Sequence, residues 1–570
     1  RHNAVDNTSL RNEIFFMGDS SSVPETLTFA ADLTLQGEGE ITAYYSEDRL
    51  QILGTVAGET NGLLLERINN DGNRLTIDSS AGPVDFNREL ENIHLQGLAS
   101  SDHSHQVGFR TNDHAKLRNV TFDLDATLQS KAHVESFGGL TINGRFSFAP
   151  TDAYYFTTLE ATGGQTIAGT GTISLTNPGT LAEQISNEIV LDGVSSEAEQ
   201  LVFGADLTIE GAGRLRAYDA EDSLKILGTL RGTADAGGLI IRSIDNYNTT
   251  TDVNESIAID ASLGEVVFDG WLRRAHLTAV DGQTGQILLT NNTILDDIHL
   301  SIDTNIGDGI ERTYAHTDVY GGLTLDADLR LQPGPSGDIE LQFKGSQVLD
   351  GNGRIFMHSP SAGASSDLWI EFIGQQDVAE RFTIGSEIEL LGSGRILSTT
   401  TDDSILLLGQ LTADDGKLKV EDLEPVEGTL ALTDDGQIDV NGDLQLTERS
   451  RIQIALSQDD QSASSPRFQV SGQFSQHGSL DLVVGNAFTA EIGDEYKIFK
   501  SSSGDFSGEF SSFTGFDLGG GKAFELVQQE NDIIARVTTL EQAMGGGFVQ
   551  VNETQSTPFS EDSSFFPSDI

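Results

Sequence analysis

Residues 27–58 read LTFAADLTLQGEGEITAYYSEDRLQILGTVAG. Residues 201–232 read LVFGADLTIEGAGRLRAYDAEDSLKILGTLRG, which aligns without a gap and is identical at 18 of 32 positions. A third copy, FTIGSEIELLGSGRILSTTTDDSILLLG, runs from residue 382 to residue 409. Because a unit repeated along a chain stacks on its neighbours, this pattern predicts an elongated repeat protein.

The similarity extends well beyond these core motifs. His94–Leu95 recurs as His276–Leu277, and FGGLT at residues 137–141 recurs as YGGLT at residues 320–324. A block of about 175 residues has therefore been duplicated, and the third copy, which begins at Phe382, degenerates. A catalytic site is usually unique in a chain, so residues repeated in this way favour a structural role.

A shorter pulse recurs inside each block, in the form apolar-x-apolar-x-Gly-x-Gly-x-apolar. Other strand-like runs lie between these pulses at a spacing of about 20 to 25 residues. This spacing fits one coil of short stacked strands, and glycine permits the positive φ angles that tight corners demand. We therefore predict an all-β chain that folds as a parallel β-helix, or β-solenoid. The pulses are GEGEI at 37–41, GTGTI at 169–173, GAGRL at 211–215, GNGRI at 351–355 and GSGRI at 392–396.

The character of the sequence changes after residue 428. Successive runs read FQVSG at 468–472, GSLDL at 478–482, GDEYKIF at 493–499 and FSGEF at 506–510. This succession resembles the C-terminal β end module of large secreted bacterial parallel β-helix proteins, the autotransporter-passenger-like surface proteins. The resemblance covers about 110 of 570 residues. It implies the architecture and the compartment, and it says little about activity.

The repeats and the end module divide the chain. We expect an N-terminal arm (1–26), β-solenoid block 1 (27–200), block 2 (201–381), a partial third block with a linker at 421–427 (382–427), a C-terminal β end module (428–540) and a C-terminal arm (541–570).

Composition excludes several classes of protein. The formal net charge is -55, from 88 acidic and 33 basic residues, so the surface repels nucleic-acid phosphates and anionic lipid. There is no cysteine, which excludes disulfides and thiolate metal sites, and no apolar run is long enough for a transmembrane helix. The chain begins with Arg1, which is typical of a processed product or of an engineered fragment. With the acidity and the repeats, we expect a secreted bacterial protein at the cell surface.

Acidic pairs occupy equivalent positions in the three copies. Asp48, Asp222 and Asp403 are their second members. We interpret them as turn residues, because aspartate accepts backbone N–H bonds at tight turns. Calcium binding is the alternative, which makes Ca²⁺ the one cofactor to consider, and glycoside hydrolysis by paired carboxylates is the third.

Other reactive residues form no recognisable catalytic motif. His103 and His105 with nearby His114 suggest a metal, but no further ligand stands at a standard spacing, so we interpret them as loop residues. Tyr44–Tyr45, Tyr154–Tyr155 and Trp271 suggest a glycan-stacking face, although phenylalanine greatly outnumbers tyrosine and tryptophan.

Both ends of a solenoid expose unpaired strand edges. Apolar residues lie outside the repeats at both ends of this chain, so we expect arms that add a strand to a neighbouring copy. We therefore predict a non-enzymatic, extracellular structural protein whose solenoid rod self-assembles head-to-tail into a filament, sheath or matrix. An adhesin that binds glycans is the alternative, and a polysaccharide lyase or hydrolase is the third. The candidate assembly residues are Ile14, Phe15, Phe16, Phe548, Val549, Val551, Phe565 and Phe566.

Overall fold

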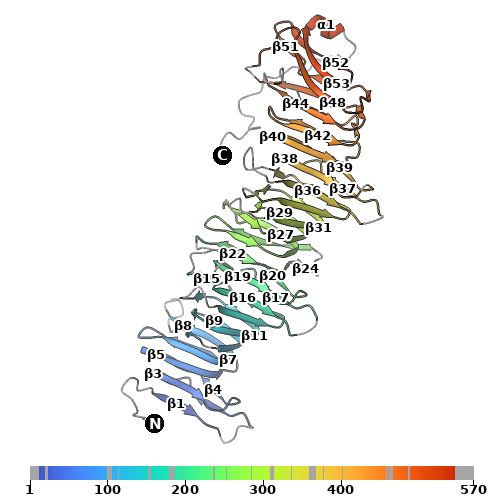
Figure 1. Cartoon of the computed structure of the whole chain (residues 1–570). Coiled ribbons are helices and arrows are strands. Elements are labelled where there is room, and N and C mark those ends of the chain that lie inside the picture. The colour runs from blue at the N-terminus through green and yellow to red at the C-terminus, as the bar shows by residue number, and fades with distance from the viewer. Residues whose placement is uncertain are drawn as a thin grey trace. The chain divides into compact units, whose positions relative to one another are not determined.

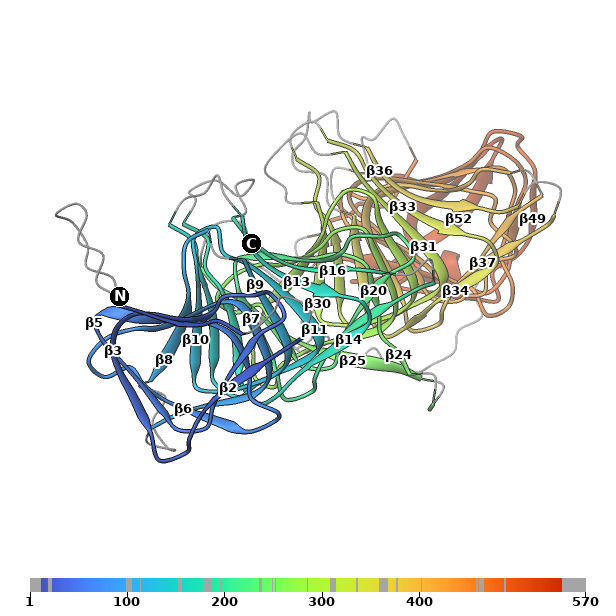
Figure 2. The same cartoon turned by 90° about the horizontal axis from the view of Figure 1, so that it is seen from below.

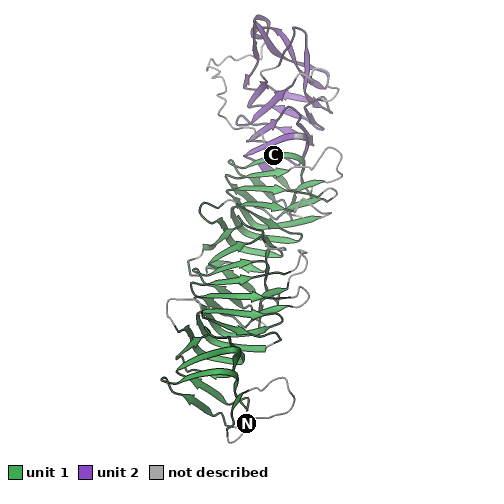
Figure 3. Cartoon of the chain, turned by 90° about the vertical axis from the view of Figure 1, so that its left-hand side faces the viewer, with its two compact units in different colours: residues 1–405 green, residues 406–570 purple. Residues whose placement is uncertain are grey.

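The structure, a computed structural model, confirms the predicted fold class. Strands hold 64% of the residues and helix 1%, and the strands form a parallel β-solenoid of about 17 turns. The chain divides into two compact units, residues 1–405 and 406–570 (Figure 3). The structure describes residues 12–545 apart from 19–22, 99–104, 113, 152–155, 179–185, 195–196, 235–237, 249, 252, 284, 308–313, 335–336, 358–366, 376–377, 401, 458–459, 461–465 and 486–487.

Three faces make up each turn of the first unit. A strand on one face pairs in parallel with the strand of the next turn on that face, so Ala126 lies opposite Phe146, and Phe146 lies opposite Ile173. Successive turns follow the order of the sequence (Figure 1), and Figure 2 shows the first turns in front with later turns behind them.

Most strands of the first unit each lie on only one of the three faces. On the first face are β1 (Glu13–Phe16), β8 (Gln106–Phe109), β10 (Asp125–Gln129), β12 (Arg145–Ala149), β15 (Thr172–Leu175), β18 (Thr208–Gly211), β21 (Thr229–Gly232), β25 (Val253–Asp260), β34 (Gln347–Gly351) and β37 (Arg381–Ile384). On the second face are β2 (Thr26–Phe29), β4 (Arg49–Ile52), β13 (Thr157–Thr162), β16 (Asn187–Asp192), β19 (Gly213–Ala217), β22 (Leu239–Ile241), β26 (Val266–Phe268), β28 (Gln286–Leu289), β30 (Asp303–Ile306), β32 (Asp328–Leu331) and β35 (Arg354–Met357). On the third face are β6 (Arg74–Asp78), β14 (Gln165–Ala168), β17 (Gln200–Phe203), β20 (Ser223–Ile226), β23 (Ile244–Asp245), β33 (Ile339–Lys344) and β36 (Leu368–Ile373).

Longer strands bend at a corner and serve more than one face. They are β3 (Thr34–Ala43), β5 (Thr55–Asn69), β7 (Val84–Gly97), β9 (His114–Asp123), β11 (His133–Ile142), β27 (Trp271–Ala279), β29 (Thr293–Ser301), β31 (Ala315–Leu325) and β38 (Glu389–Ser398). The short β24 (Tyr247–Asn248) pairs antiparallel with β25, and β39 (Ser404–Leu407) contains the division between the two units.

Side chains alternate between the interior and the outside of each turn. In β6, Leu75 and Ile77 are fully buried while their neighbours are exposed or half-buried. The next turn places Leu95 opposite Leu75, so apolar side chains stack in columns. Burying each Leu or Ile contributes roughly 1.5–3 kcal/mol, and neighbouring turns supply the cover that one turn lacks.

Single residues with positive φ make the corners inside the long strands. Asn119 turns β9 from the second face to the third with φ 52°, and it donates a hydrogen bond to the corner residue Asn92 of the previous turn (2.9 Å). The next corner, in β11, uses Gly138 with φ 72°, where a Cβ atom would lie 2.8 Å from the Asn119 side-chain oxygen. Here glycine is required both by its φ angle and by the close approach of the neighbouring turn.

The two full copies share a buried asparagine at one corner. Asn70 is fully buried, accepts a hydrogen bond from the Ile52 N–H (2.7 Å) and donates one to the Ile52 carbonyl (2.7 Å). Asn246 makes the same two bonds with Ile226, at 2.7 and 2.8 Å. Each amide therefore takes the place of a neighbouring strand where the chain turns the corner.

The duplicated block does not fill a whole number of turns. The first copy opens with β2, which pairs with β4 on the second face, and the second copy opens with β17, which pairs with β20 on the third. The third copy opens with β37, which pairs with β34 on the first face. Each copy therefore starts one face further round the solenoid, and equivalent residues lie on different faces.

The second unit contains three parallel stacks of its own. Its strands are β40 (Gln410–Glu421), β41 (Thr429–Leu432), β42 (Gln437–Asn441), β43 (Leu444–Gln445), β44 (Arg451–Leu456), β45 (Phe468–Val470), β46 (Phe474–Gln476), β47 (Ser479–Val484), β48 (Glu495–Ser501), β49 (Phe506–Gly508) and β50 (Ser512–Thr514). Then β51 (Asp517–Gly519), β52 (Lys522–Gln529) and β53 (Asp532–Thr539) form antiparallel pairs, with β53 between β48 and β52, before α1 (Leu540–Gly545). Antiparallel pairing thus ends the stack of β42, β45 and β48, while β49 and β50 end the other two.

Two segments differ from the sequence expectation. Residues 13–16, assigned to the N-terminal arm, form β1, which pairs in parallel with β3 as part of the first turn. Residues 421–427 are not a linker, because Val426 is fully buried. Its N–H donates a hydrogen bond to the Gln445 carbonyl (2.9 Å), and it forms an isolated parallel β-bridge with Leu446. The polar residues around Val426 concealed this one core position.

We expect Asn70→Ala and Asn246→Ala each to lower the free energy of unfolding by about 2 kcal/mol, because a buried N–H and C=O lose their partners. Urea denaturation of the full chain measures the loss. The control is Asn61→Ala, at an exposed position, with an expected change below about 0.5 kcal/mol. Equal effects at buried and exposed positions would contradict this account of the corner.

Candidate functional site

Charged side chains on the outside of the first unit pair across successive turns. Arg231 Nε lies 3.0 Å from Asp260 Oδ2, and Arg354 Nε lies 3.0 Å from Asp328 Oδ1. The two arginine side chains remain 37% and 46% exposed, and solvent-accessible ion pairs contribute only about 0–1 kcal/mol each. Two groups of residues stand apart from this general pattern, namely the three repeated aspartates and the histidine clusters.

The three repeated aspartates brace loops from the preceding turn. Asp403 is buried, and its two carboxylate oxygens accept bonds from the Gly374 N–H (3.1 Å) and the Glu380 N–H (3.0 Å). The bonds therefore close the neck of a loop, while the preceding acid, Asp402, is exposed. The equivalent bonds run to Asp48 from Gly18 (3.0 Å) and Glu25 (3.1 Å), and to Asp222 from Glu199 (2.8 Å).

Backbone N–H groups bonded to these carboxylates are what the interpretation as turn residues expects. The N–H donors point at the carboxylates, so a Ca²⁺ ion at Asp48, Asp222 or Asp403 would have to displace them inside the protein. Burial raises the pKa of Asp222, and the bond from the Glu199 N–H opposes that rise. The three aspartates also lie at three different corners, since the copies begin on different faces, and they do not form one extended site.

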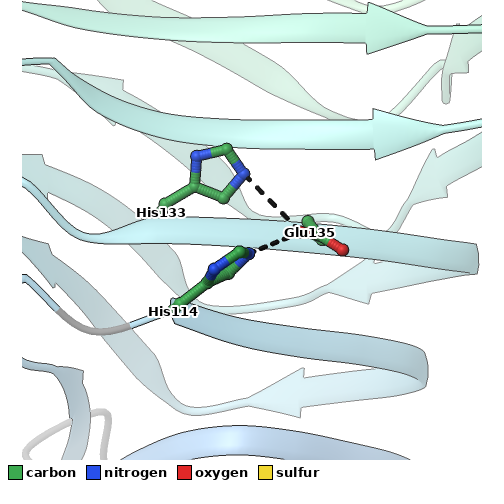
Figure 4. A group of neighbouring side chains, drawn as sticks. All are labelled: His114, His133 and Glu135. Carbon is green, nitrogen blue, oxygen red and sulfur yellow. Dashed lines mark hydrogen bonds and ion pairs between the residues drawn. The ribbon is translucent and has the colours of Figure 1, made fainter.

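Two histidines and a glutamate come together on the second face. His114 in β9 lies directly opposite His133 in β11, and their rings stand 4.7 Å apart. Both rings turn a nitrogen towards Glu135, which lies two residues beyond His133 (Figure 4). The ligand atoms of the three side chains all lie within 4.8 Å of one another.

Two further charged groups complete this cluster. Glu160 in β13 places Oε2 3.2 Å from His133 Nε2, and Lys116 Nζ lies 3.1 Å from Glu135 Oε2. Burial raises the pKa of Glu135, but hydrogen bonds from Lys116 and His114 outweigh it and hold the pKa below its ordinary value. Burial raises the pKa of Glu160 above its ordinary value.

The second copy keeps part of this arrangement on the third face. His316 in β31 lies 2.9 Å from Asp318 and 3.1 Å from Glu340, and Lys344 lies 3.2 Å from Asp318. Tyr314 donates a hydrogen bond to Glu340 (2.6 Å), and burial with this bond raises the pKa of Tyr314 to about 12.

The sequences of the two strands explain the similarity. HVESFGGLTI at residues 133–142 matches HTDVYGGLTL at residues 316–325, so the histidine and the acid two residues later recur together. The sequence reasoning missed His133, because its partners His114 and Glu160 are 19 and 27 residues away. Each separation is about the length of one coil. A search for acidic and histidine residues spaced by one coil could therefore have revealed the cluster.

A second histidine pair stacks on the first face. The rings of His276 and His299 stand 3.9 Å apart and are parallel to within 2°. Ser301 lies 2.9 Å from His276 Nε2, and Asp326 lies 2.6 Å from His299 Nε2. Burial lowers the pKa of His276, the neighbouring His299 lowers it further, and Asp326 opposes them.

Other sequence candidates do not join these clusters. His105 is buried, and its Nδ1 accepts a hydrogen bond from the Ser79 N–H (3.1 Å). Tyr44 packs edge-on against Tyr45, with ring centroids 5.1 Å apart, while Trp271 lies beneath the Arg273 guanidinium. His103, Tyr154 and Tyr155 lie outside the described residues.

The candidate assembly residues at the N-terminal end lie in the first turn. Ile14 and Phe15 are 48% and 52% exposed, Phe16 is half-buried and Met17 is 61% exposed. Asn12 and Phe16 accept hydrogen bonds from β3 and its following residue, so the backbone groups of Glu13 and Phe15 point away from β3. Among the described strands, only β3 pairs with β1. Phe548, Val549, Val551, Phe565 and Phe566 lie outside the described residues.

Comparison with known proteins gives no identification. No family model matches the chain, and no curated protein matches it significantly. Within the described part of the chain, no helix has the length and apolar character needed to cross a membrane. Any function must therefore be argued from the residues themselves.

We expect Gly193→Ala to destabilise the first unit, because a Cβ atom there would lie 2.2 Å from Asp222 Oδ2. The cost is about 1–3 kcal/mol, the usual range for overpacking, and thermal unfolding measures it. The control is Gly485→Ala, since a Cβ atom at Gly485 meets nothing within 4 Å. An unchanged midpoint for Gly193→Ala would show that Asp222 does not brace this loop.

We expect the His276–His299 stack to weaken in acid. The unfolded chain protonates His276 near its ordinary pKa of 6.5, but the folded chain does so only at lower pH. The unfolded state therefore binds more protons just below pH 6.5, and stability falls as the pH drops through that window. His276→Gln should reduce this slope, measured by urea denaturation at several pH values. The exposed His477→Gln is the control, and an unaltered slope in His276→Gln would refute the prediction.

Proposed function

We propose that this chain is a non-enzymatic, extracellular structural protein whose solenoid assembles end to end into a filament, sheath or matrix. The assembly contact is strand addition at β1, and its occupant is the C-terminal segment 546–570 of a neighbouring copy. The observation that carries this proposal is the edge of the first turn, where β1 offers outward-pointing backbone groups and exposed apolar side chains.

The edge is suited to strand addition. Parallel pairing uses alternate residues of β1, so Glu13 and Phe15 can each donate and accept a bond from a further strand. Phe15 at 52% and Met17 at 61% exposure add apolar surface at the same edge. An open strand edge with apolar side chains is a template on which a strand of another chain can pair.

The two ends of the chain differ in a way that supports a directional contact. Among the described strands, antiparallel pairing with β53 closes the stack that ends in β48, whereas β49 and β50 are the last strands of the other two parallel stacks. The segment after α1 contains FVQV at residues 548–551, a short run able to add as a strand. A contact from this segment to the β1 edge of the next copy is head-to-tail, and such a contact builds a filament when its rotation does not close into a ring.

The outward charges support a structural role in salt-containing surroundings. Ion pairs connect neighbouring turns, and the excess of acid, with a net charge of -55, favours solubility of the chain in salty surroundings. The resemblance of residues 428–540 to the end module of secreted β-helix proteins supports the extracellular location.

We expect the full chain to form assemblies that grow with protein concentration, and Phe15→Pro to remain monomeric. Proline removes the N–H that points away from β3 and leaves the bonds between β1 and β3 intact. Sedimentation velocity and negative-stain microscopy measure the size of the particles. Deletion of residues 546–570 should have the same effect.

The control is Val348→Glu, which alters a similarly exposed side chain (47%) in β34, an internal strand. This variant should assemble as the unaltered chain does. The proposal fails if the unaltered chain stays monomeric at high concentration, or if Phe15→Pro assembles normally. Assembly that survives the deletion but not the proline change would exclude segment 546–570 as the occupant.

A further inference from the structure

We propose that His114, His133, Glu135 and Glu160 form a binding site for a first-row divalent metal ion, with Zn²⁺ as the preferred ion. The site lies on the outward side of the second face, across three successive turns. It is separate from the β1 edge and does not depend on assembly.

The backbone places the four side chains together. His114 and His133 are in-register neighbours on β9 and β11, and Glu135 is the next outward residue of β11. Glu160 is the in-register neighbour of Glu135 on β13. Because the paired strands fix the backbone positions, only side-chain rotation is needed to bring the ligand atoms together.

The present distances are close to those of a ligand set. The atoms of His114, His133 and Glu135 lie within 4.8 Å of one another, and Glu160 Oε2 lies 3.2 Å from His133 Nε2. A zinc ion bound at about 2.0–2.2 Å to each atom would require these side chains to rotate towards it. Two imidazoles and two carboxylates are a donor set for Zn²⁺ rather than for Ca²⁺, which takes oxygen ligands.

Lys116 is the internal competitor for this ion. Its ammonium lies 3.1 Å from Glu135 Oε2 and now supplies the positive charge that a metal would supply. The Lys116 side chain is 50% exposed, so it can move into water when a cation arrives. Removing Lys116 should therefore strengthen metal binding, an effect that a purely structural cluster would not produce.

The second copy provides a matched comparison inside the same chain. His316 and Asp318 occupy the positions of His133 and Glu135. The preceding turn meets His316 with Asn292, whose N–H donates a hydrogen bond to the His316 carbonyl (2.8 Å), and not with a second histidine. An amide is a poor zinc ligand beside an imidazole. The site at His316 should therefore bind the ion much more weakly than the site at His133.

The experiment is a titration of the untagged full chain, freed of metal, with Zn²⁺ in competition with a chromophoric chelator. We expect one site that is lost in His133→Asn, with a drop in affinity of about tenfold or more, and retained in His316→Asn. Lys116→Gln should bind more tightly than the unaltered chain. Excess Ca²⁺ should not displace the ion. Circular dichroism checks that each variant keeps its strands.

Three results would overturn the proposal. They are the absence of a zinc site in the unaltered chain, equal losses in His133→Asn and His316→Asn, and weaker binding in Lys116→Gln. Co²⁺ gives an independent readout, because a four-coordinate site with imidazole and carboxylate ligands absorbs visible light strongly. A spectrum typical of the hydrated Co²⁺ ion would count against the site as well.

Discussion

In-register pairing between successive turns is the constraint on which the rest of the first unit depends. One turn is too small to bury its own apolar side chains, so each gains its interior only when the next turn stacks upon it. The column from Ala126 through Phe146 to Ile173 shows both parts of this coupling, since the residues that pair through their backbones also stack in the core. Corners must then repeat at the same place in each turn. Asn92, Asn119 and Gly138 meet that demand in three successive turns.

The same constraint decides where function can lie. Inward side chains are committed to the core, so chemistry is left to outward positions, corners and the ends of the stack. Neighbouring turns bring together residues that lie one coil apart in sequence, as with His114, His133 and Glu160. The duplicated block exceeds a whole number of turns by one strand, so the related clusters at His133 and His316 lie on different faces. The duplication therefore supplies variants of a site rather than a continuous binding surface.

Much of the fold could be predicted from the sequence, and much of the site could not. Gly-x-Gly pulses and alternating apolar residues predicted the solenoid, because they reflect local corners and the period of a strand. Corners at Arg88 and Arg274 gave no signal, since a positive φ at arginine is imposed by the stack and not by its own preference. The burial of Val426 gave no signal either, because a single apolar residue among polar neighbours shows no alternating pattern. The role of the three aspartates could be inferred because they repeat at equivalent positions. The histidine cluster could not, because coil length varies from turn to turn and the sequence alone does not show which residues of neighbouring coils lie opposite each other.

The register of the turns can be measured directly, because the chain contains no cysteine of its own. Thr121 and Thr141 are in-register outward residues of β9 and β11, while Ala168, opposite Thr141 in β14, lies two turns from Thr121. Paired Cα atoms in neighbouring strands fall within the range that a disulfide spans. With cysteine at Thr121 and Thr141, mild oxidation should give a rapid intramolecular disulfide, and with cysteine at Thr121 and Ala168 it should not. Failure of the first pair, or equal rates for both pairs, would contradict the stacking on which this account is built.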